Sequence, residues 1–215
     1  MEFMKSPLEI ERQSMEIIAR YVEDLNLNFE EKKIYSRIIH AAGDVELAPL
    51  IKIHPLAIDA IKSAIEVGGN IFTDVQMVRS GINKLALRRY GGKIYCRIAD
   101  DDTKRYAALE GITRSMAAMR LFGERLNKSV VVIGNAPTAL FEVLKLVREG
   151  ILPAAIIGVP VGFVGAADSK EELAAQEKIP FITVSGTKGG SSIAAAIVNA
   201  ILYLMKDELI SAGKS

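Results

Sequence analysis

One short segment of the chain combines a residue type that moves protons with one that binds carboxylates. Arg37 and His40 are three residues apart in Arg37-Ile-Ile-His40-Ala-Ala-Gly43-Asp44, so a helix would present both side chains on one face. An arginine binds carboxylates, and an imidazole exchanges protons near neutral pH. The spacing therefore indicates acid/base chemistry on an acidic substrate. The alternative is a histidine that only completes the end of its helix.

Further along the chain, three apolar runs each lead into a turn rich in glycine. The turns are Gly134-Asn-Ala-Pro-Thr-Ala139, Gly158-Val-Pro-Val-Gly-Phe-Val-Gly-Ala166 and Gly186-Thr-Lys-Gly-Gly-Ser-Ser192. A buried strand that feeds a helix through such a turn leaves backbone N–H groups at the helix N-terminus, where they bind anions. None of the turns has the spacing of a Walker loop or of a dinucleotide fingerprint. We therefore expect an anionic ligand at one edge of a sheet, and the spacing disfavours a nucleotide.

Each of the first two turns also has a simpler interpretation. In the first, Asn135 suits a left-handed turn and Thr138 suits a helix cap, which is all that a strand-to-helix connection requires. In the second, Val161, Gly162 and Phe163 belong to an apolar turn. Such a turn favours a large, partly hydrophobic ligand, and the alternative is a loop buried beneath a partner subunit.

The third turn carries the only charge in the three turns. Lys188, Gly189 and Ser191 would form an anion site together with backbone N–H groups. The alternative is an ordinary capped turn. We consider two further basic residues as ligands for an anion. Arg114 would lie within a helix and could point into a cleft, whereas Arg88 belongs to a pair of arginines expected at a solvated turn.

The remaining histidine and the single cysteine give weaker signals. His54 precedes Pro55 at a predicted helix start, which favours a capping or surface role. Cys96 lies in the predicted strand Lys93–Ile98, where core packing is expected and a functional thiol is the alternative. Neither histidine has cysteines or clustered acids at metal-ligand spacing, so we expect no metal held by the protein.

Composition limits the class of protein. The 215 residues carry a net charge of +1, and the single cysteine excludes a disulfide within the chain, which favours a reducing compartment. So small a charge does not support non-specific binding to nucleic acid. The N-terminus lacks the apolar core of a signal peptide, and the uncharged window Gly150–Ala167 is interrupted by glycines and prolines that break a membrane helix. We expect a cytoplasmic protein that binds neither nucleic acid nor membranes.

The first part of the chain, about residues 6–67, is predicted to be mostly helical. Its apolar residues follow the helical period over Leu8–Leu25, Phe29–Ala42 and Pro55–Val67. A short strand is expected at Asn70–Thr73, and one long helix over Asp102–Leu126 with Gly111 inside it.

From Ser129 onward, strands and helices alternate. The expected pairs are Ser129–Ile133 with Thr138–Glu149, Ala154–Val159 with Lys170–Gln176, and Pro180–Val184 with Ser191–Leu204. This alternation predicts parallel strands, and continuous apolar strands suit a sheet covered on both faces. The predicted fold is one α/β domain over residues 1–215, with a doubly wound, mostly parallel sheet on which the helical N-terminal part packs. Its ligand site should lie beyond the carboxyl ends of the strands, and the tail 206–215 is expected to fray.

Six segments of the chain stand in a characteristic order. They are Arg37–Asp44, Thr73–Met77, Thr113–Ser115, Gly134–Phe141, Gly158–Ala167 and Lys188–Ser191. Together they resemble the precorrin-8X methylmutases of cobalamin biosynthesis, which include the cobalt-precorrin-8 methylmutases. Each motif is modest alone, whereas the ordered set is highly specific, and the resemblance extends from about Glu9 to Leu204.

The resemblance implies an isomerase that acts as an intramolecular transferase. A methyl group would move from C-11 to C-12 of precorrin-8X or cobalt-precorrin-8, both carboxylated tetrapyrroles, to give hydrogenobyrinate or cobyrinate. His40 would assist by protonating the macrocycle. No cofactor is implied, because the migration is internal and any cobalt would belong to the substrate.

The resemblance also implies the binding residues and the assembly. Ser14 and Arg37 occupy positions that the family uses at the substrate. The other substrate-binding residues implied are Thr73, Arg114, Asn135, Thr138, Val161, Gly162, Phe163, Lys188, Gly189 and Ser191. A homodimer is expected, with the site near the subunit boundary. A non-catalytic corrinoid-binding protein is the alternative function, and a nucleotide-binding α/β enzyme is a more distant one.

Overall fold

Six strands form one sheet that is parallel except at one edge. The computed structural model of the chain describes residues 5–212, with side chains as far as Leu209. The strands are, in spatial order, β1 (Ile51–Ile53), β6 (Phe181–Val184), β5 (Ala155–Gly158), β4 (Val130–Ile133), β2 (Ile71–Thr73) and β3 (Ile94–Tyr95). Only β1 pairs antiparallel, with β6. The predicted α/β class with a mostly parallel sheet is confirmed.

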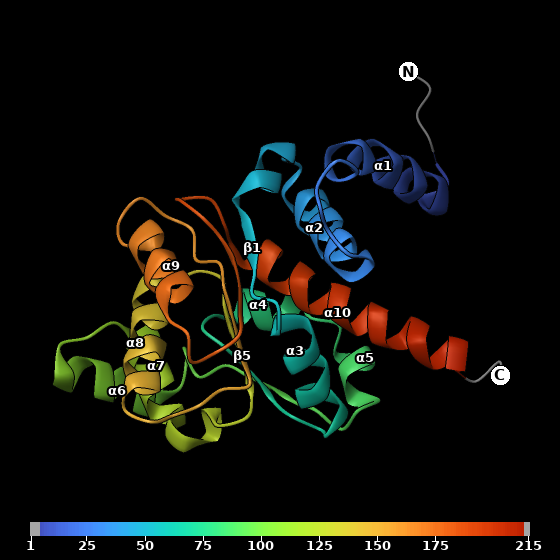
Figure 1. Cartoon of the computed structure of the whole chain (residues 1–215). Coiled ribbons are helices and arrows are strands. Elements are labelled where there is room, and N and C mark those ends of the chain that lie inside the picture. The colour runs from blue at the N-terminus through green and yellow to red at the C-terminus, as the bar shows by residue number, and fades with distance from the viewer. Residues whose placement is uncertain (1–4, 213–215) are drawn as a thin grey trace.

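Helices cover both faces of this sheet (Figure 1). The α-helices are α1 (Pro7–Val22), α2 (Phe29–Ala42), α3 (Ala57–Glu66), α4 (Gln76–Gly81), α5 (Lys84–Arg88), α6 (Asp101–Glu110), α7 (Arg114–Phe122), α8 (Pro137–Arg148), α9 (Ala166–Ala175) and α10 (Ser191–Ala212), and two 3₁₀ helices are η1 (Val45–Leu50) and η2 (Gly123–Leu126). In Figure 1, α7, α8 and α9 lie on one side of the strands, and α2, α3 and α10 lie on the other.

The apolar runs noted in the sequence divide their side chains between two cores. In β4, Val130 and Val132 pack with α2, α3 and α10, whereas Val131 and Ile133 pack with α7, α8 and α9. Successive strand residues point to opposite faces, so a strand buried on both faces favours apolar residues along its whole length. All residues of β4, β5 and β6 are buried, and the one polar residue among them, Thr183 of β6, donates its hydroxyl to the carbonyl of Gly158.

The N-terminal part contains a strand that its helical pattern did not predict. Strand β1 has only three residues, and the exposed Lys52 lies between Ile51 and Ile53. So short an alternation is hidden among helical segments, and the strand forms because β6 offers it an open edge.

Two helix predictions are wrong in their extent. The long helix expected over Asp102–Leu126 is broken, because Gly111 adopts a left-handed conformation (φ +65°) that ends α6, and Thr113 then caps α7. The expected frayed tail is helical as far as Ala212, since α10 continues well past Leu204. Residues 213–215 of that tail lie outside the described residues.

The topological switch point of the sheet lies between β4 and β2. From β4 the chain proceeds through α8 to β5 on one side, whereas β2 is followed by β3 on the other. Open α/β sheets bind ligands in the crevice at such a point, outside the carboxyl ends of the strands. Within residues 5–212, no helix combines the length and the apolar character needed to cross a membrane.

Candidate functional site

His40 lies in the last turn of α2 and is exposed to solvent. Helix α2 starts at a capping box formed by Asn28 and Glu31, and it ends where Gly43 takes a left-handed conformation (φ +64°). The helix rests along α10 (Figure 1). Both ends of α2 are therefore fixed, and the imidazole stands at the end of a well-defined helix.

The segment that follows His40 is tied to the third glycine turn. Asp44 caps η1 by accepting a hydrogen bond from the backbone N–H of Glu46 at 3.0 Å. Its other carboxylate oxygen lies 2.7 Å from Nζ of Lys188, and Glu46 Oε2 lies 3.1 Å from the same atom. These contacts raise the pKa of Lys188 and lower that of Asp44. The structure thus brings the end of α2 beside Lys188.

The second and third glycine turns are joined through their backbones. The N–H of Gly190 donates to the carbonyl of Val159 at 2.8 Å, and the N–H of Gly162 donates to the carbonyl of Thr187 at 3.1 Å. Gly189 lies so close that a Cβ there would stand 2.3 Å from the Val159 oxygen. The two turns form one layer over the carboxyl ends of β5 and β6.

A buried lysine is hydrogen-bonded to the backbone of this layer. Lys170 of α9 is 1% exposed, and its Nζ donates to the carbonyl oxygen of Lys188 at 2.7 Å. Burial lowers the pKa of Lys170 to about 8, because the charged ammonium loses its hydration. The sequence carried no signal for this role, since Lys170 looks like any lysine of an exposed helix.

The first glycine turn already holds an anion, which corrects our expectation that its N–H groups bind a ligand. The Asp74 carboxylate is fully buried and accepts hydrogen bonds from the N–H groups of Gly134, Asn135 and Ala136 at 2.8–3.0 Å. Burial raises the pKa of Asp74, and the three donors oppose this shift. An aspartate directly after a strand at a parallel edge is a signal from which this contact could have been predicted.

Two local expectations for this turn are also wrong. Asn135 is exposed but not left-handed, since Lys128 is the one non-glycine residue with positive φ in the described chain. Thr138 does not cap α8; its hydroxyl lies 2.9 Å from that of Thr113, which caps α7. The contact joins the starts of α7 and α8. Arg114, the exposed first residue of α7, therefore lies near Thr138.

The first turn is also packed against α10, which connects it with the other turns. A Cβ on Gly134 would stand 2.9 Å from Cα of Ser191, so only glycine fits here. Thr73, which precedes Asp74, is buried and donates through its hydroxyl to the carbonyl of Tyr95 at 3.2 Å. Nearby, burial raises the pKa of the Cys96 thiol, which favours packing over reactivity.

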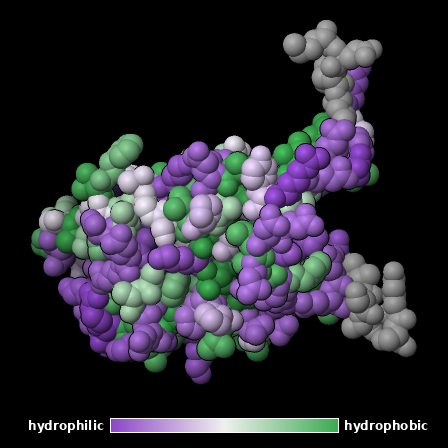
Figure 2. Space-filling model, turned by 45° about the horizontal axis from the view of Figure 1, so that its top comes forward, coloured by the Kyte–Doolittle hydropathy of each residue, from purple (hydrophilic) through white to green (hydrophobic). Residues whose placement is uncertain are grey.

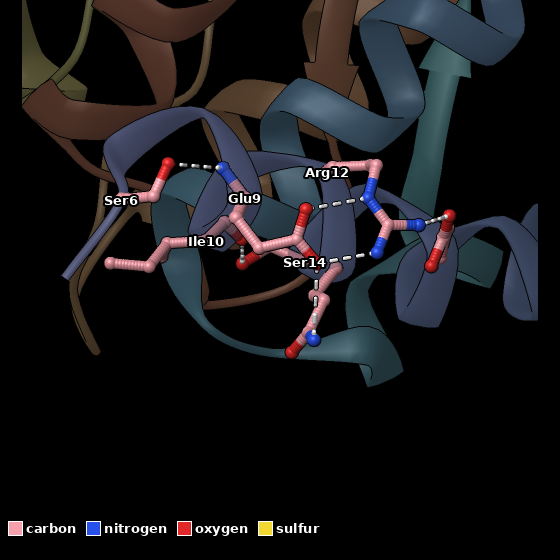
Figure 3. Close-up of polar contacts among 7 residues, drawn as sticks. Ser6, Glu9, Ile10, Arg12 and Ser14 are labelled. Atoms are coloured by element: carbon pink, nitrogen blue, oxygen red, sulfur yellow. Dashed lines mark hydrogen bonds and ion pairs between the residues drawn. The ribbon is translucent and has the colours of Figure 1, made fainter. Parts of the chain in front are cut away.

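Ser14 lies on α1 and Arg37 lies on α2, so neither residue belongs to the glycine turns. The Ser14 hydroxyl donates to the carbonyl of Ile10 at 2.8 Å within α1, as Figure 3 shows. Figure 3 also shows Arg12 of the same helix bound to Glu9. Arg37 of α2 donates to Glu11 of α1 at 2.8 Å and lies over the ring of Tyr203.

The apolar second turn is open to solvent. Phe163 is 96% exposed, Val164 89% and Val161 45%. Hydrophobic residues also reach the surface among hydrophilic ones elsewhere, as Figure 2 shows for one face. Three adjoining apolar side chains on a glycine-rich loop are unusual for a surface that meets only water.

The predicted residues therefore fall into three neighbouring groups. The layer of the second and third turns contains Val161, Gly162, Phe163, Lys188, Gly189 and Ser191, and the end of α2 that bears His40 is attached to it. Thr73, Asn135, Thr138 and Arg114 surround the switch point. Ser14 and Arg37 lie on α1 and α2. Among residues 5–212, no cluster of three or more histidine, cysteine or acidic side chains is arranged as a metal site.

Comparison with known proteins identifies the family. The sequence profile described as precorrin-8X methylmutase matches residues 9–204. The cobalt-precorrin-8 methylmutase of Leptospira interrogans is 45% identical over 203 residues, which cover 91% of this chain and 92% of that protein. The precorrin-8X methylmutase of a Sinorhizobium species is 39% identical over 202 residues, which cover 93% and 96% respectively.

The fold agrees with these matches. A crystal structure described as the precorrin-8X methylmutase of Thermus thermophilus superposes with a TM-score of 0.84 at 30% identity, covering 93% of this chain and 98% of that one. Sequence and structure thus match over nearly the whole length of both proteins. The chain belongs to the precorrin-8X methylmutase family.

Proposed function

We propose that the protein moves a methyl group from C-11 to C-12 of precorrin-8X or cobalt-precorrin-8, giving hydrogenobyrinate or cobyrinate. Membership of the family over residues 9–204 supports this reaction. The observation that carries the site assignment is the contact of Asp44 and Glu46 with Lys188. It joins the helix end that bears His40 to the glycine turns at the carboxyl edge of the sheet, where α/β sheets bind their ligands.

His40 is proposed as the proton donor. A proton added to a conjugated macrocycle spreads positive charge through the ring and weakens the bond of the migrating methyl group. A positioned acid of this kind contributes ~10²–10⁴-fold to the rate. The exposed place of His40 at the end of α2 leaves its imidazole accessible to a large planar ligand. The remaining acceleration would come from restraint and electrostatics.

Dispersed donors are proposed to hold the substrate carboxylates. Arg37, Arg114 and Lys188 come from different elements, as a ligand with carboxylates around its rim requires. Arg37 and Lys188 are bound to acidic residues of the chain itself. Exposed ion pairs of this kind contribute little net stability, so a substrate carboxylate can replace the acidic partner.

A homodimer with the site near the subunit boundary is part of the proposal. The exposed side chains of Val161, Phe163 and Val164 adjoin the layer of glycine turns, and a second copy would cover them. We place the reaction in the cytoplasm, and we propose that the protein needs no cofactor because the rearrangement is internal. Cobalt, where present, would be carried by the substrate.

The first test is the His40→Ala variant, with His54→Ala as the matched control. His40→Ala should retain substrate binding and the far-UV spectrum but lose turnover by about 10²-fold or more, because the proton donor is gone. His54 accepts a hydrogen bond from the N–H of Leu56 before α3, away from the turns, so its variant should keep its turnover. Product formation is followed by the absorption spectrum of the corrinoid.

Two results would contradict the proposal. Turnover of His40→Ala near the wild-type rate would remove the role of His40. Wild-type protein that binds both precorrin-8X and cobalt-precorrin-8 without changing either would instead indicate a non-catalytic corrinoid-binding protein. Parallel assays with metal-free and cobalt-loaded substrate would show which of the two the protein uses.

A further inference from the structure

A cavity of about 410 Å³ opens beside β3, the edge strand of the sheet next to β2. Four basic residues line it: Arg79 from α4, Lys84 and Arg88 from α5, and Lys93 from the chain that enters β3. No acidic residue lines it in the part of the chain that the structure describes. None of these lining residues belongs to the substrate site predicted from the sequence.

The basic residues of this cavity have no acidic partner in an ion pair within residues 5–212. The chain as a whole is nearly neutral, with 27 basic and 26 acidic residues. The ion pairs found among residues 5–212 involve other basic residues and leave out the four that line the cavity. Four cations in one hollow therefore reflect a local concentration of charge, which attracts anions.

Arg79 gives the second, independent sign of a ligand. Its Nε is buried and has no hydrogen-bond partner among the described residues, while its Nη1 donates to Gln76 at 3.2 Å. Native proteins seldom leave a buried donor unpaired, so the chain itself does not fully satisfy this guanidinium at the wall of the cavity.

The backbone around the cavity is fixed by close packing. A Cβ on Gly92 would stand 2.7 Å from the carbonyl oxygen of Gly69, and Gly91 has a φ of +82°. The N–H of Lys93 donates to the side chain of Asn70 at 3.2 Å. The turn from α5 into β3 is therefore held by close packing at Gly92 and by a hydrogen bond at Lys93.

We propose that this cavity binds an anion of the polycarboxylate class, with two or more separated negative charges. Its cations come from three segments of the chain rather than from one turn, which suits separated carboxylates better than one compact phosphate. Leu87, Ile94 and Tyr95 provide apolar wall for the hydrocarbon between those carboxylates. The carboxylates belong either to a free small acid or to the acidic side chains of the tetrapyrrole, and the second source rests on the proposed function.

Calorimetric titration with tricarballylate tests the cavity without any assay of activity. The wild-type protein should bind it saturably at low ionic strength and more weakly as salt is added. Lys84→Met should weaken binding about three-fold, and Arg79→Met about ten-fold or more, because a charge-assisted contact of the half-buried Arg79 is screened less than a contact of the exposed Lys84. Lys84 is exposed, so its variant should fold normally even if Arg79→Met does not. Arg105→Met, which removes an exposed charge on α6, is the control and should bind as wild type.

Failure of the wild type to bind tricarballylate would overturn the proposal, as would equal affinity for inorganic phosphate or unchanged binding by both cavity variants. The KM of a Lys84→Met/Arg88→Met double variant then identifies the source of the carboxylates. A raised KM with unchanged kcat assigns them to the tetrapyrrole, and an unchanged KM assigns them to a free acid. If the wild type turns over neither precorrin-8X nor cobalt-precorrin-8, the proposed function fails while the tricarballylate result stands.

Discussion

At the scale of single residues, Lys170 shows how a buried charge can support a site by holding its backbone. Its ammonium is almost completely buried, and its one hydrogen bond described here goes to a backbone carbonyl of the third glycine turn. No acidic side chain contributes to the shift of its pKa, which burial alone lowers. Lys170 is therefore expected to make stability depend on pH.

The direction of this dependence follows from the proton balance. The pKa of Lys170 falls from 10.5 in the unfolded chain to about 8 in the fold, so between these values the unfolded state binds more protons and folding becomes more favourable as pH rises. The gain is of order 1–3 kcal/mol. Urea unfolding at about pH 7 and about pH 10 should show this gain in the wild type relative to Lys170→Met.

Comparison with the variant is essential because other groups titrate in the same range. Burial raises the pKa values of Cys96 and Tyr35, and their contribution to stability is lost as pH rises. An equal change in the free energy of unfolding for wild type and Lys170→Met would contradict the assignment of this effect to Lys170.

At the scale of elements, the contact between the second and third turns leaves no room for a side chain at Gly189. The Cβ of Gly189→Ala would stand 2.3 Å from the Val159 oxygen, so the two turns must separate. The free energy of unfolding should fall by roughly 1–3 kcal/mol. Gly186→Ala is the matched control, because Gly186 has a φ of +76° but open space around it, and its cost should be about 1 kcal/mol. Urea unfolding measures both, and a smaller loss for Gly189→Ala than for Gly186→Ala would contradict this contact.

The same scale shows what the sequence could and could not predict. The three regular strand–turn–helix units were predictable because both faces of β4, β5 and β6 are buried and glycine marks each turn. Strand β1 was not, since its three residues depend on the open edge of β6 for their pairing. The contacts of Lys188 with Asp44 and Glu46 join residues that are more than a hundred positions apart, so no local sequence pattern predicts them.

At the scale of the whole molecule, the proposed dimer can be tested by substitution in the exposed apolar loop that contains Phe163. Sedimentation of the wild type should give twice the mass of the 23.3 kDa chain. Phe163→Asp should shift the protein toward monomer, because a charge would be buried in the interface. Leu109→Asp, at a leucine of α6 that is also largely exposed, should leave the mass unchanged. A monomeric wild type would contradict the proposed dimer. A Phe163→Asp variant that is still a dimer would show that the interface does not include Phe163.

The Asp74 carboxylate at the switch point bears on how the protein chooses among the solutes of a cell. Free phosphates and nucleotides are attracted to unoccupied helix N-termini, but here three N–H groups are already bound to an anion that cannot dissociate. A phosphate would have to displace a covalently attached competitor whose effective concentration is very high. The first glycine turn therefore keeps the architecture of a phosphate-binding turn while its own aspartate closes it to free phosphate, so a ligand at this sheet edge must be held by other groups.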